Sequence, residues 1–279
     1  MIFQLEDARI FSILLSNMLD VSNYAAMKID SNGIVIKGES YAHFILYSVE
    51  LSANFFDEYY GIEKPFIFVF DARSIYNDIK KFRDPISFDL VGTEIKISVG
   101  GYEFRYGYST DPRYIKQTFW ESELDRELPF ATATIKTDIL WKIATTMKRY
   151  LKAPYLTLLN KVKIRVSVSE GITISFVVEG VSEERLLREA PPVFKITPDK
   201  MISFDTKYLE KLSITEGARI IKGVMEERHY TDSLVRAFGK KDLSSITTLH
   251  FLGSNVIKVE YPLLGPDGTE AGYFKYFIL

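Results

Sequence analysis

Residue types that could do catalytic chemistry are few and scattered in this sequence. The three histidines, His43, His229 and His250, lie far apart, and none has a partner at metal-ligand spacing. The 279 residues include no cysteine, which excludes disulfides, thiol catalysis and thiolate metal sites. Neither the dinucleotide-binding glycine motif nor the Walker phosphate loop is present. The carboxylates Glu121 and Glu123 lie in a charged loop, where solvation is the simpler interpretation. We therefore expect no metal, no cofactor and no catalytic residue.

The composition indicates a folded globular protein. Hydrophobic residues make up 47% of the chain and charged residues 26%, enough to bury a substantial core. The formal net charge of −2 argues against a surface that is basic throughout, but it allows a local basic face. No secretion signal and no apolar run of membrane-helix length occurs. We expect that the protein is not secreted. It should be cytoplasmic and associated with the nucleoid or, in a eukaryote, nuclear.

The second half of the chain repeats motifs of the first half in the same order. Amphipathic helices are predicted over 7–20 and over 136–151. Each is followed by a strand, a Ser-x-Gly-Ile turn at 31–34 or 169–172, and a further strand. Phe-Asp then leads into a helix pattern in 68–82 and in 201–213. Finally, Ile-Lys-Ile at 95–97 corresponds to Ile-Lys-Val at 257–259. Four matches in one order predict a duplicated domain.

The spacing of these matches predicts extra residues in the second half. The offset between matching motifs rises by about 28 residues between Phe-Asp and the last strands, which places an insertion around 214–242. Alternatively, 231–241 is the matching helix and the extra residues precede it. The expected fold class is α+β, with two similar domains of antiparallel sheets and helices on one face. We predict a first domain over 1–118, an acidic connector over 119–130 and a second domain over 131–279.

This order of elements, with a histidine in the turn after the second strand, resembles a sliding clamp of the PCNA type. The closing stretch IKVEYPLLGPDGTEAGYFKYFIL (257–279) is similar to the end of that family, a strand followed by a hairpin and a Lys-Tyr-aromatic strand. The resemblance implies a ring, usually of three chains, with helices around a hole that duplex DNA threads. It also implies a non-enzymatic processivity factor for replication and repair. The implied partners are duplex DNA, DNA polymerase and other clamp-binding enzymes, a clamp loader, and further copies or homologues in a homotrimer or heterotrimer.

A clamp that slides needs cations that attract phosphates without reading bases. Lys142 and Arg149 are seven residues apart in the helix over 136–151, opposite its apolar stripe. The predicted DNA-binding residues are Arg73, Lys80, Lys81, Lys142, Lys148, Arg149, Lys207 and Lys211. If 231–241 is the matching helix, Arg236, Lys240 and Lys241 replace the last two. The helix over 7–20 departs from the family pattern, because its expected polar face of Arg9, Ser12, Ser16, Asn17 and Asp20 has one basic residue.

The resemblance also implies a hydrophobic groove for partner peptides and edge strands that close the ring. The groove positions would be His43, Phe44, Leu46, Leu124, Leu128, Val256, Phe277 and Ile278. The edge stretches would be 101–109 and 181–189, with Tyr102, Phe104, Tyr106, Leu186 and Leu187 at the subunit interface. Two alternatives remain: a subunit of a hetero-oligomeric clamp or a monomeric clamp-like processivity factor, and a metal-dependent nucleic-acid enzyme whose ligands are distant in the sequence.

Overall fold

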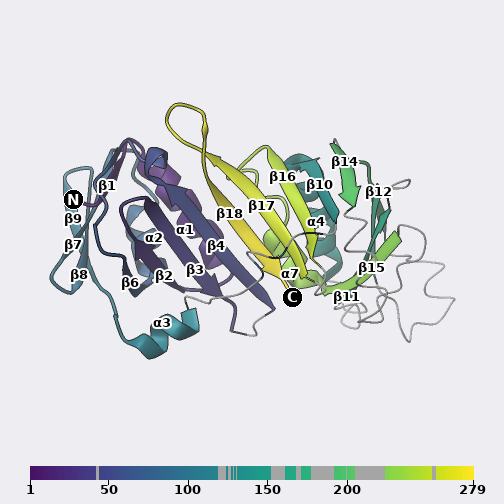
Figure 1. The fold of residues 1–279 in the computed structure, drawn as a ribbon, viewed down its shortest axis with the longest axis horizontal. Helices are drawn as coiled ribbons and strands as arrows, with labels where there is room; N and C mark the ends of the chain where they lie inside the picture. The colour runs from purple at the N-terminus through teal and green to yellow at the C-terminus, as the bar shows by residue number, and fades with distance from the viewer. Residues whose placement is uncertain are drawn as a thin grey trace. The chain divides into compact units, whose positions relative to one another are not determined.

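The protein is described by a computed structural model (Figure 1) that covers residues 1–41, 44–118, 124, 127, 129, 131–151, 161–167, 171–176, 192–198, 200–204, 224–252 and 256–279. The chain is α+β and divides into two compact units. Unit 1 comprises Met1–Ser122 and Tyr261–Lys275, and unit 2 comprises Glu123–Glu260 and Tyr276–Leu279. Most of the C-terminal hairpin therefore belongs to unit 1.

Unit 1 contains two antiparallel sheets and a pair of helices. Its elements are β1 (Phe3–Leu5), α1 (Ala8–Leu19), β2 (Tyr24–Ile29), β3 (Gly33–Glu39), β4 (Ile45–Ser52), the 3-10 turn η1 (Ala53–Phe55), β5 (Glu58–Tyr59), β6 (Phe66–Asp71), α2 (Ala72–Ile79), β7 (Ile86–Val91), β8 (Glu94–Val99), β9 (Tyr102–Gly107) and α3 (Pro112–Thr118). The strand orders are β5-β1-β7-β8-β9 and β4-β3-β2-β6. In Figure 1, α1 and α2 lie behind strands β2 to β4, so these helices cover one face of that sheet.

Unit 2 repeats this arrangement element by element. Its elements are β10 (Ala131–Lys136), α4 (Thr137–Leu151), β11 (Lys161–Ser167), β12 (Gly171–Phe176), β13 (Val193–Ile196), β14 (Lys200–Phe204), β15 (Val224–Tyr230), α7 (Thr231–Ala237) and β16 (Ile246–Leu252). The last two strands, β17 (Val256–Leu264) and β18 (Glu270–Ile278), are divided between the units, with Tyr261–Lys275 in unit 1. The strand orders β14-β10-β16-β17 and β13-β12-β11-β15 match β5-β1-β7-β8 and β4-β3-β2-β6. The predicted α+β fold class and the duplication are confirmed.

One of the four predicted motif matches is wrong. β14, which contains the second Phe of the Phe-Asp motif, pairs with β10 as β5 pairs with β1. The counterpart of β6 is instead β15, because β15 pairs with β11 as β6 pairs with β2. The helix that corresponds to α2 is therefore α7, which confirms the alternative alignment with 231–241. Since β15 and α7 have counterparts in unit 1, the additional residues of the second half precede β15, and the placement around 214–242 is corrected.

The glycines of the repeated Ser-x-Gly-Ile turns are required by close packing. A Cβ at Gly33 would lie 2.0 Å from the Leu51 carbonyl oxygen, and one at Gly171 would lie 2.3 Å from that of Ile196. Gly171 also has φ +76°, a left-handed conformation that glycine adopts without a steric penalty. Only glycine fits where these hairpins approach the next strand, so the motif recurs in both units.

Capping and burial explain the first helix pair. The Asp7 carboxylate accepts a hydrogen bond from the Arg9 amide (2.8 Å) at the start of α1, and Asp71 does the same for Arg73 (3.0 Å) at the start of α2. The buried residues of α1 include Phe11, Leu14, Leu15 and Met18, and those of α2 are Ala72, Ile75 and Ile79. Each helix thus presents one apolar face to the core. No described helix combines the length and apolar character needed to cross a membrane.

Candidate nucleic-acid interface

The helices pack in pairs, α1 with α2 in unit 1 and α4 with α7 in unit 2. In α4, the buried positions are Leu140, Ile143, Ala144 and Met147. Lys142, Lys148 and Arg149 are exposed on the side away from this stripe. Among the described residues, the side chains of Lys148 and Arg149 have no ion-pair or hydrogen-bond partner. The predicted basic row of α4 is therefore available to a polyanion.

Two basic residues in and after α7, the second helix of this pair, form ion pairs with neighbouring carboxylates. The Lys241 ammonium lies 2.5 Å from a carboxylate oxygen of Asp138 and 4.0 Å above the centre of the Trp141 ring. This hydrogen bond, with the charges of Lys241 and Lys142, holds the pKa of Asp138 below its ordinary value. In α7, Arg236 donates to Asp232 over 2.7 Å. The carboxylates of Asp138 and Asp232 are thus each paired with a cation. The sequence analysis missed Trp141, which is 43% exposed despite its size.

In the helix pair of unit 1, the described cations that form no ion pair are on α2 and directly after it rather than on α1. Arg73, Lys80 and Lys81 are all exposed, and Lys80 donates to the Asn77 side chain over 2.9 Å. On α1 the single basic residue, Arg9, forms an ion pair with Asp7. Lys207 and Lys211 lie outside the described residues.

The faces of α1 differ from the prediction. Ser12 and Asn17 are buried, and Asn17 donates to the Ile13 carbonyl over 2.8 Å, so neither belongs to an exposed polar face. Ile10, an apolar residue, is 40% exposed. Because Leu15 is buried and Ile10 is not, the apolar face of α1 is centred on a side of the helix that does not include Ile10.

Each unit has a sheet that ends in a strand whose outer edge is paired with no other strand among the described residues. β9 is the last strand of its sheet in unit 1, and β13 is the last strand of its sheet in unit 2. Tyr102 in β9 is 62% exposed and packs beside Phe82 and Phe104. The Tyr106 hydroxyl donates to Asp78 over 2.8 Å, which ties β9 to α2. Burial, followed by this hydrogen bond, raises the pKa of Tyr106 above its ordinary value. Leu186 and Leu187 lie outside the described residues.

Comparison with known proteins identifies the architecture. No family model and no curated protein matches the sequence. A solved PCNA2-PCNA3 complex from Sulfolobus tokodaii is similar with a TM-score of 0.72 and 15% identity, covering 100% of this chain and 98% of that one. Proliferating Cellular Nuclear Antigen from Entamoeba histolytica is similar with a TM-score of 0.71, 12% identity, and coverage of 99% and 96%. The chain has the fold of a PCNA-type sliding clamp. A third similar structure is that of the C-terminal region of FEN-1 bound to A. fulgidus PCNA, with a TM-score of 0.69, 16% identity, and coverage of 99% and 96%.

On this clamp fold, the predicted partner groove is only partly at the surface. Phe44 is 41% exposed and Leu124 is half-buried. The side chains of four other predicted groove residues are buried: Leu46, Val256, Phe277 and Ile278. His43 and Leu128 lie outside the described residues.

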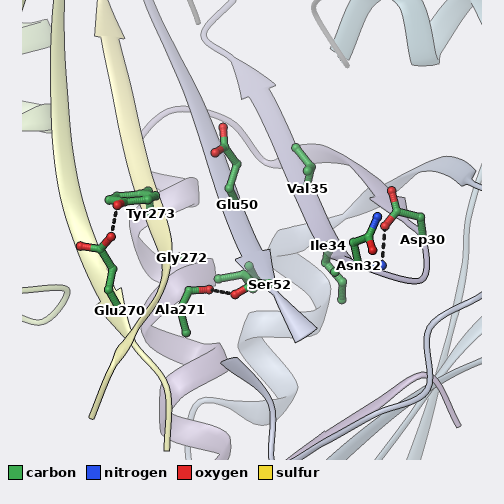
Figure 2. A pocket seen from close by; sticks show the side chains of 12 residues that line it. Asp30, Asn32, Ile34, Val35, Glu50, Ser52, Glu270, Ala271, Gly272 and Tyr273 are labelled. Atoms are coloured by element: carbon green, nitrogen blue, oxygen red, sulfur yellow. Dashed lines mark hydrogen bonds between the residues drawn. The ribbon is translucent and has the colours of Figure 1, made fainter. Parts of the chain in front are cut away.

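A hollow of 410 Å³ lies on unit 1, at the ends of β3, β4 and β18 (Figure 2). Its polar walls include Asp30, Asn32, Glu50, Ser52 and Glu270. Each carboxylate has a partner: Asp30 accepts from the Asn32 amide (2.8 Å), Glu50 from Lys275 (2.8 Å), and Glu270 from Tyr273. The acidic groups of this hollow are thus satisfied internally.

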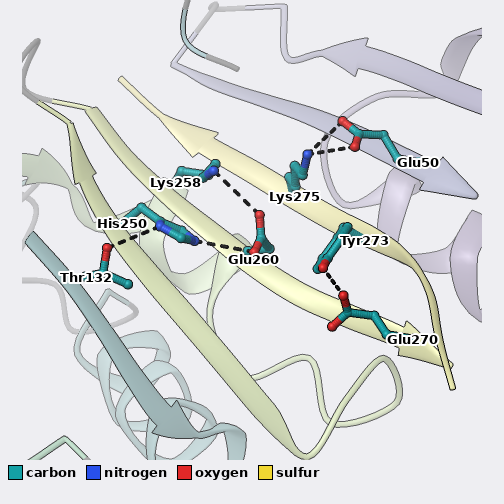
Figure 3. A network of polar contacts seen from close by, with 8 residues as sticks. All are labelled: Glu50, Thr132, His250, Lys258, Glu260, Glu270, Tyr273 and Lys275. Atoms are coloured by element: carbon teal, nitrogen blue, oxygen red, sulfur yellow. Dashed lines mark hydrogen bonds and ion pairs between the residues drawn. The ribbon is translucent and has the colours of Figure 1, made fainter. Parts of the chain in front are cut away.

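His250 is part of a polar network in unit 2 (Figure 3). His250 Nε2 lies 3.4 Å from a carboxylate oxygen of Glu260, and Nδ1 lies 3.5 Å from the Thr132 hydroxyl. Lys258 lies 3.5 Å from the other oxygen of Glu260. These contacts join β10, β16 and β17. In the described part of the chain, no group of three or more His, Cys, Asp or Glu side chains is placed to hold a metal ion.

Proposed function

We propose that the chain is a subunit of a DNA sliding clamp, a non-enzymatic scaffold that encircles duplex DNA without reading its sequence. The observation that carries this proposal is a clamp fold over the full chain together with the exposed basic rows of α2 and α4. Attraction between such cations and phosphates is independent of sequence and permits sliding. Because α7 is the counterpart of α2, Lys207 and Lys211 are not part of this proposed basic set.

The internal repeat supports a specific way to close the ring. Within unit 1, β4 lies beside β18, where the Tyr47 and Phe274 rings are 6.0 Å apart and Lys275 is 2.8 Å from Glu50. In the repeat, β9 corresponds to β18, since it follows β8 as β18 follows β17, and β13 corresponds to β4. We infer that β9 of one chain pairs with β13 of the next, which would cover both free edges. The predicted interface residues Tyr102, Phe104 and Tyr106 are in β9.

The proposed partners are duplex DNA, a clamp loader, DNA polymerase and other clamp-binding enzymes. A similar structure holds FEN-1 bound to a clamp, which supports docking of this kind. The exposed Phe44 and the half-buried Leu124 are the described candidates for contact with partner peptides. An aromatic anchor beside aliphatic contacts is typical of such interfaces.

A hetero-oligomeric clamp is the second candidate. It is favoured by the unequal helix faces of the two units, since α1 lacks the basic row that α4 has. The similarity to a PCNA2-PCNA3 complex supports it too.

Absolute mass by light scattering separates these candidates. The chain has a mass of 32.1 kDa. A particle of three times this mass supports a self-sufficient ring, whereas a single-chain mass supports a hetero-oligomer subunit or a monomeric factor. The trimer, or the assembled hetero-oligomer, should then stimulate a DNA polymerase on primed circular DNA in the presence of a clamp loader. Absence of stimulation by either assembly would count against the clamp function.

A further inference from the structure

The two units can be aligned residue by residue at their first helices. The Ala8 amide donates to the Asp84 carbonyl over 3.1 Å, and the Thr137 amide donates to the Ser245 carbonyl over 2.9 Å. Both bonds join the first residue of a helix to the residue one or two positions before β7 or its counterpart β16. Ala8 therefore corresponds to Thr137. This alignment places the following pairs at equivalent positions: Ile13 with Lys142, Leu19 with Lys148, and Asp20 with Arg149.

The second helices have the opposite distribution of charge. α2 begins directly after β6, and α7 begins directly after β15. Arg73 therefore corresponds to Asp232, and Lys80 corresponds to Gly239. Arg73 and Lys80 are seven residues apart on α2 and its first following residue, the same separation as Lys142 and Arg149 on α4. At about 1.5 Å per residue, each helix has two exposed cations roughly 10 Å apart along its axis.

The other two helices have cations that are neutralised within the fold. Arg9 of α1 forms an ion pair with Asp7, and the pKa of Asp7 is lowered by this hydrogen bond. Arg236 of α7 forms an ion pair with Asp232. A cation that is paired with a neighbouring carboxylate adds little net charge to attract a phosphate.

We propose an exchange of DNA-binding helices between the repeats. Unit 1 binds phosphates of the duplex through its second helix, α2, whereas unit 2 binds them through its first helix, α4. This inference rests on the proposed clamp function and names the residues that act in it. Arg73 and Lys80 are the contacts of unit 1, and Lys142 and Arg149 are those of unit 2. α1 and α7 support these helices without binding DNA.

Three double variants of equal charge change test the exchange. The first is Arg73→Gln with Lys80→Gln, the second is Lys142→Gln with Arg149→Gln, and the matched control is Arg9→Gln with Arg236→Gln. All six side chains are exposed, so circular dichroism should show an unchanged fold. The probe is a fluorescein-labelled blunt duplex of about 30 base pairs, and its affinity is measured by anisotropy at several salt concentrations. Because each phosphate contact contributes about 0.9 to the slope of log K against log salt, the first two variants should each lower the slope by roughly 1.8.

The control should leave the slope unchanged. An equal reduction of this slope in the control, the α2 variant and the α4 variant would overturn the exchange, because it would mean that only the total charge of the protein determines DNA affinity. An unchanged slope in the α4 variant, while the wild-type chain binds with normal salt dependence, would overturn it too. If the wild-type chain has no salt-dependent affinity for the duplex and is also not retained on circular DNA, the clamp function itself fails.

Discussion

Replacing Gly239 by alanine tests the packing that holds α7 against α4 and so positions the basic row. Gly239 has φ +73°, and a Cβ there would lie 2.3 Å from the Trp141 Cα and 2.7 Å from its amide nitrogen. A left-handed conformation costs an alanine about 1–2 kcal/mol. The clash is with backbone of α4, which cannot rotate away, and overpacking of this kind costs about 1–3 kcal/mol more. We expect Gly239→Ala to lower the free energy of unfolding by about 2–5 kcal/mol in total.

The matched control is Gly268→Ala in the β17–β18 hairpin. Gly268 has φ +77°, and no atom lies within 4 Å of a Cβ built there. The control therefore has the conformational cost without the clash. Urea denaturation followed by circular dichroism measures both variants. If Gly239→Ala is no more destabilising than Gly268→Ala, at equal dependence on urea, the close approach of α7 to α4 is refuted.

Three further predictions concern tyrosines. Tyr47→Phe should raise the free energy of unfolding by about 1 kcal/mol, because the buried Tyr47 hydroxyl has no hydrogen-bond partner in the described part of the chain; a decrease in urea denaturation would contradict this. Burial raises the pKa of Tyr59 to about 12. Since the unfolded chain ionises first, near pH 10, stability should be intact below pH 10 and fall between pH 10 and 12. Tyr59→Phe should weaken this decline, and an unchanged alkaline profile would refute the assignment. Tyr102→Glu on the free edge of β9 should lower the mass of a trimer toward 32.1 kDa, as measured by light scattering; an unchanged trimer would contradict the β9 interface.

The duplication was predictable because its signals are local. Amphipathic periodicity marked α1 and α4, and the glycine turns recur because a side chain would collide with the next strand. The position of α7 was harder to predict. Its preceding strand β15, VMEERHY, lacks the continuous apolar run of β6, FIFVFD, and offers a weak strand signal. Phe204 at the end of β14 supplied a misleading match, because short motifs carry no information about which strand pairs with which.

The residues of the candidate site were predictable only where the period of a single helix determines which side chains are exposed. Lys142 and Arg149 follow from the helical period of α4. The pairing of Lys241 with Asp138, by contrast, joins two elements about a hundred residues apart in the sequence and depends on the packing of α4 with α7. Burial of Phe277 and Ile278 on consecutive positions breaks the two-residue alternation, because both faces of β18 are covered there. Sequence patterns do not contain this tertiary information.

Topological retention on DNA tests the sliding-clamp function most directly. The labelled protein is loaded by a clamp loader onto a nicked circular plasmid, and the DNA is then isolated by gel filtration at a salt concentration that suppresses simple phosphate binding. A closed ring should remain with the circle, leave after the plasmid is cut once, and stay if the cut ends are blocked by bound protein. Equal retention on circular and cut DNA, or none on the circle, would contradict a ring that encircles the duplex.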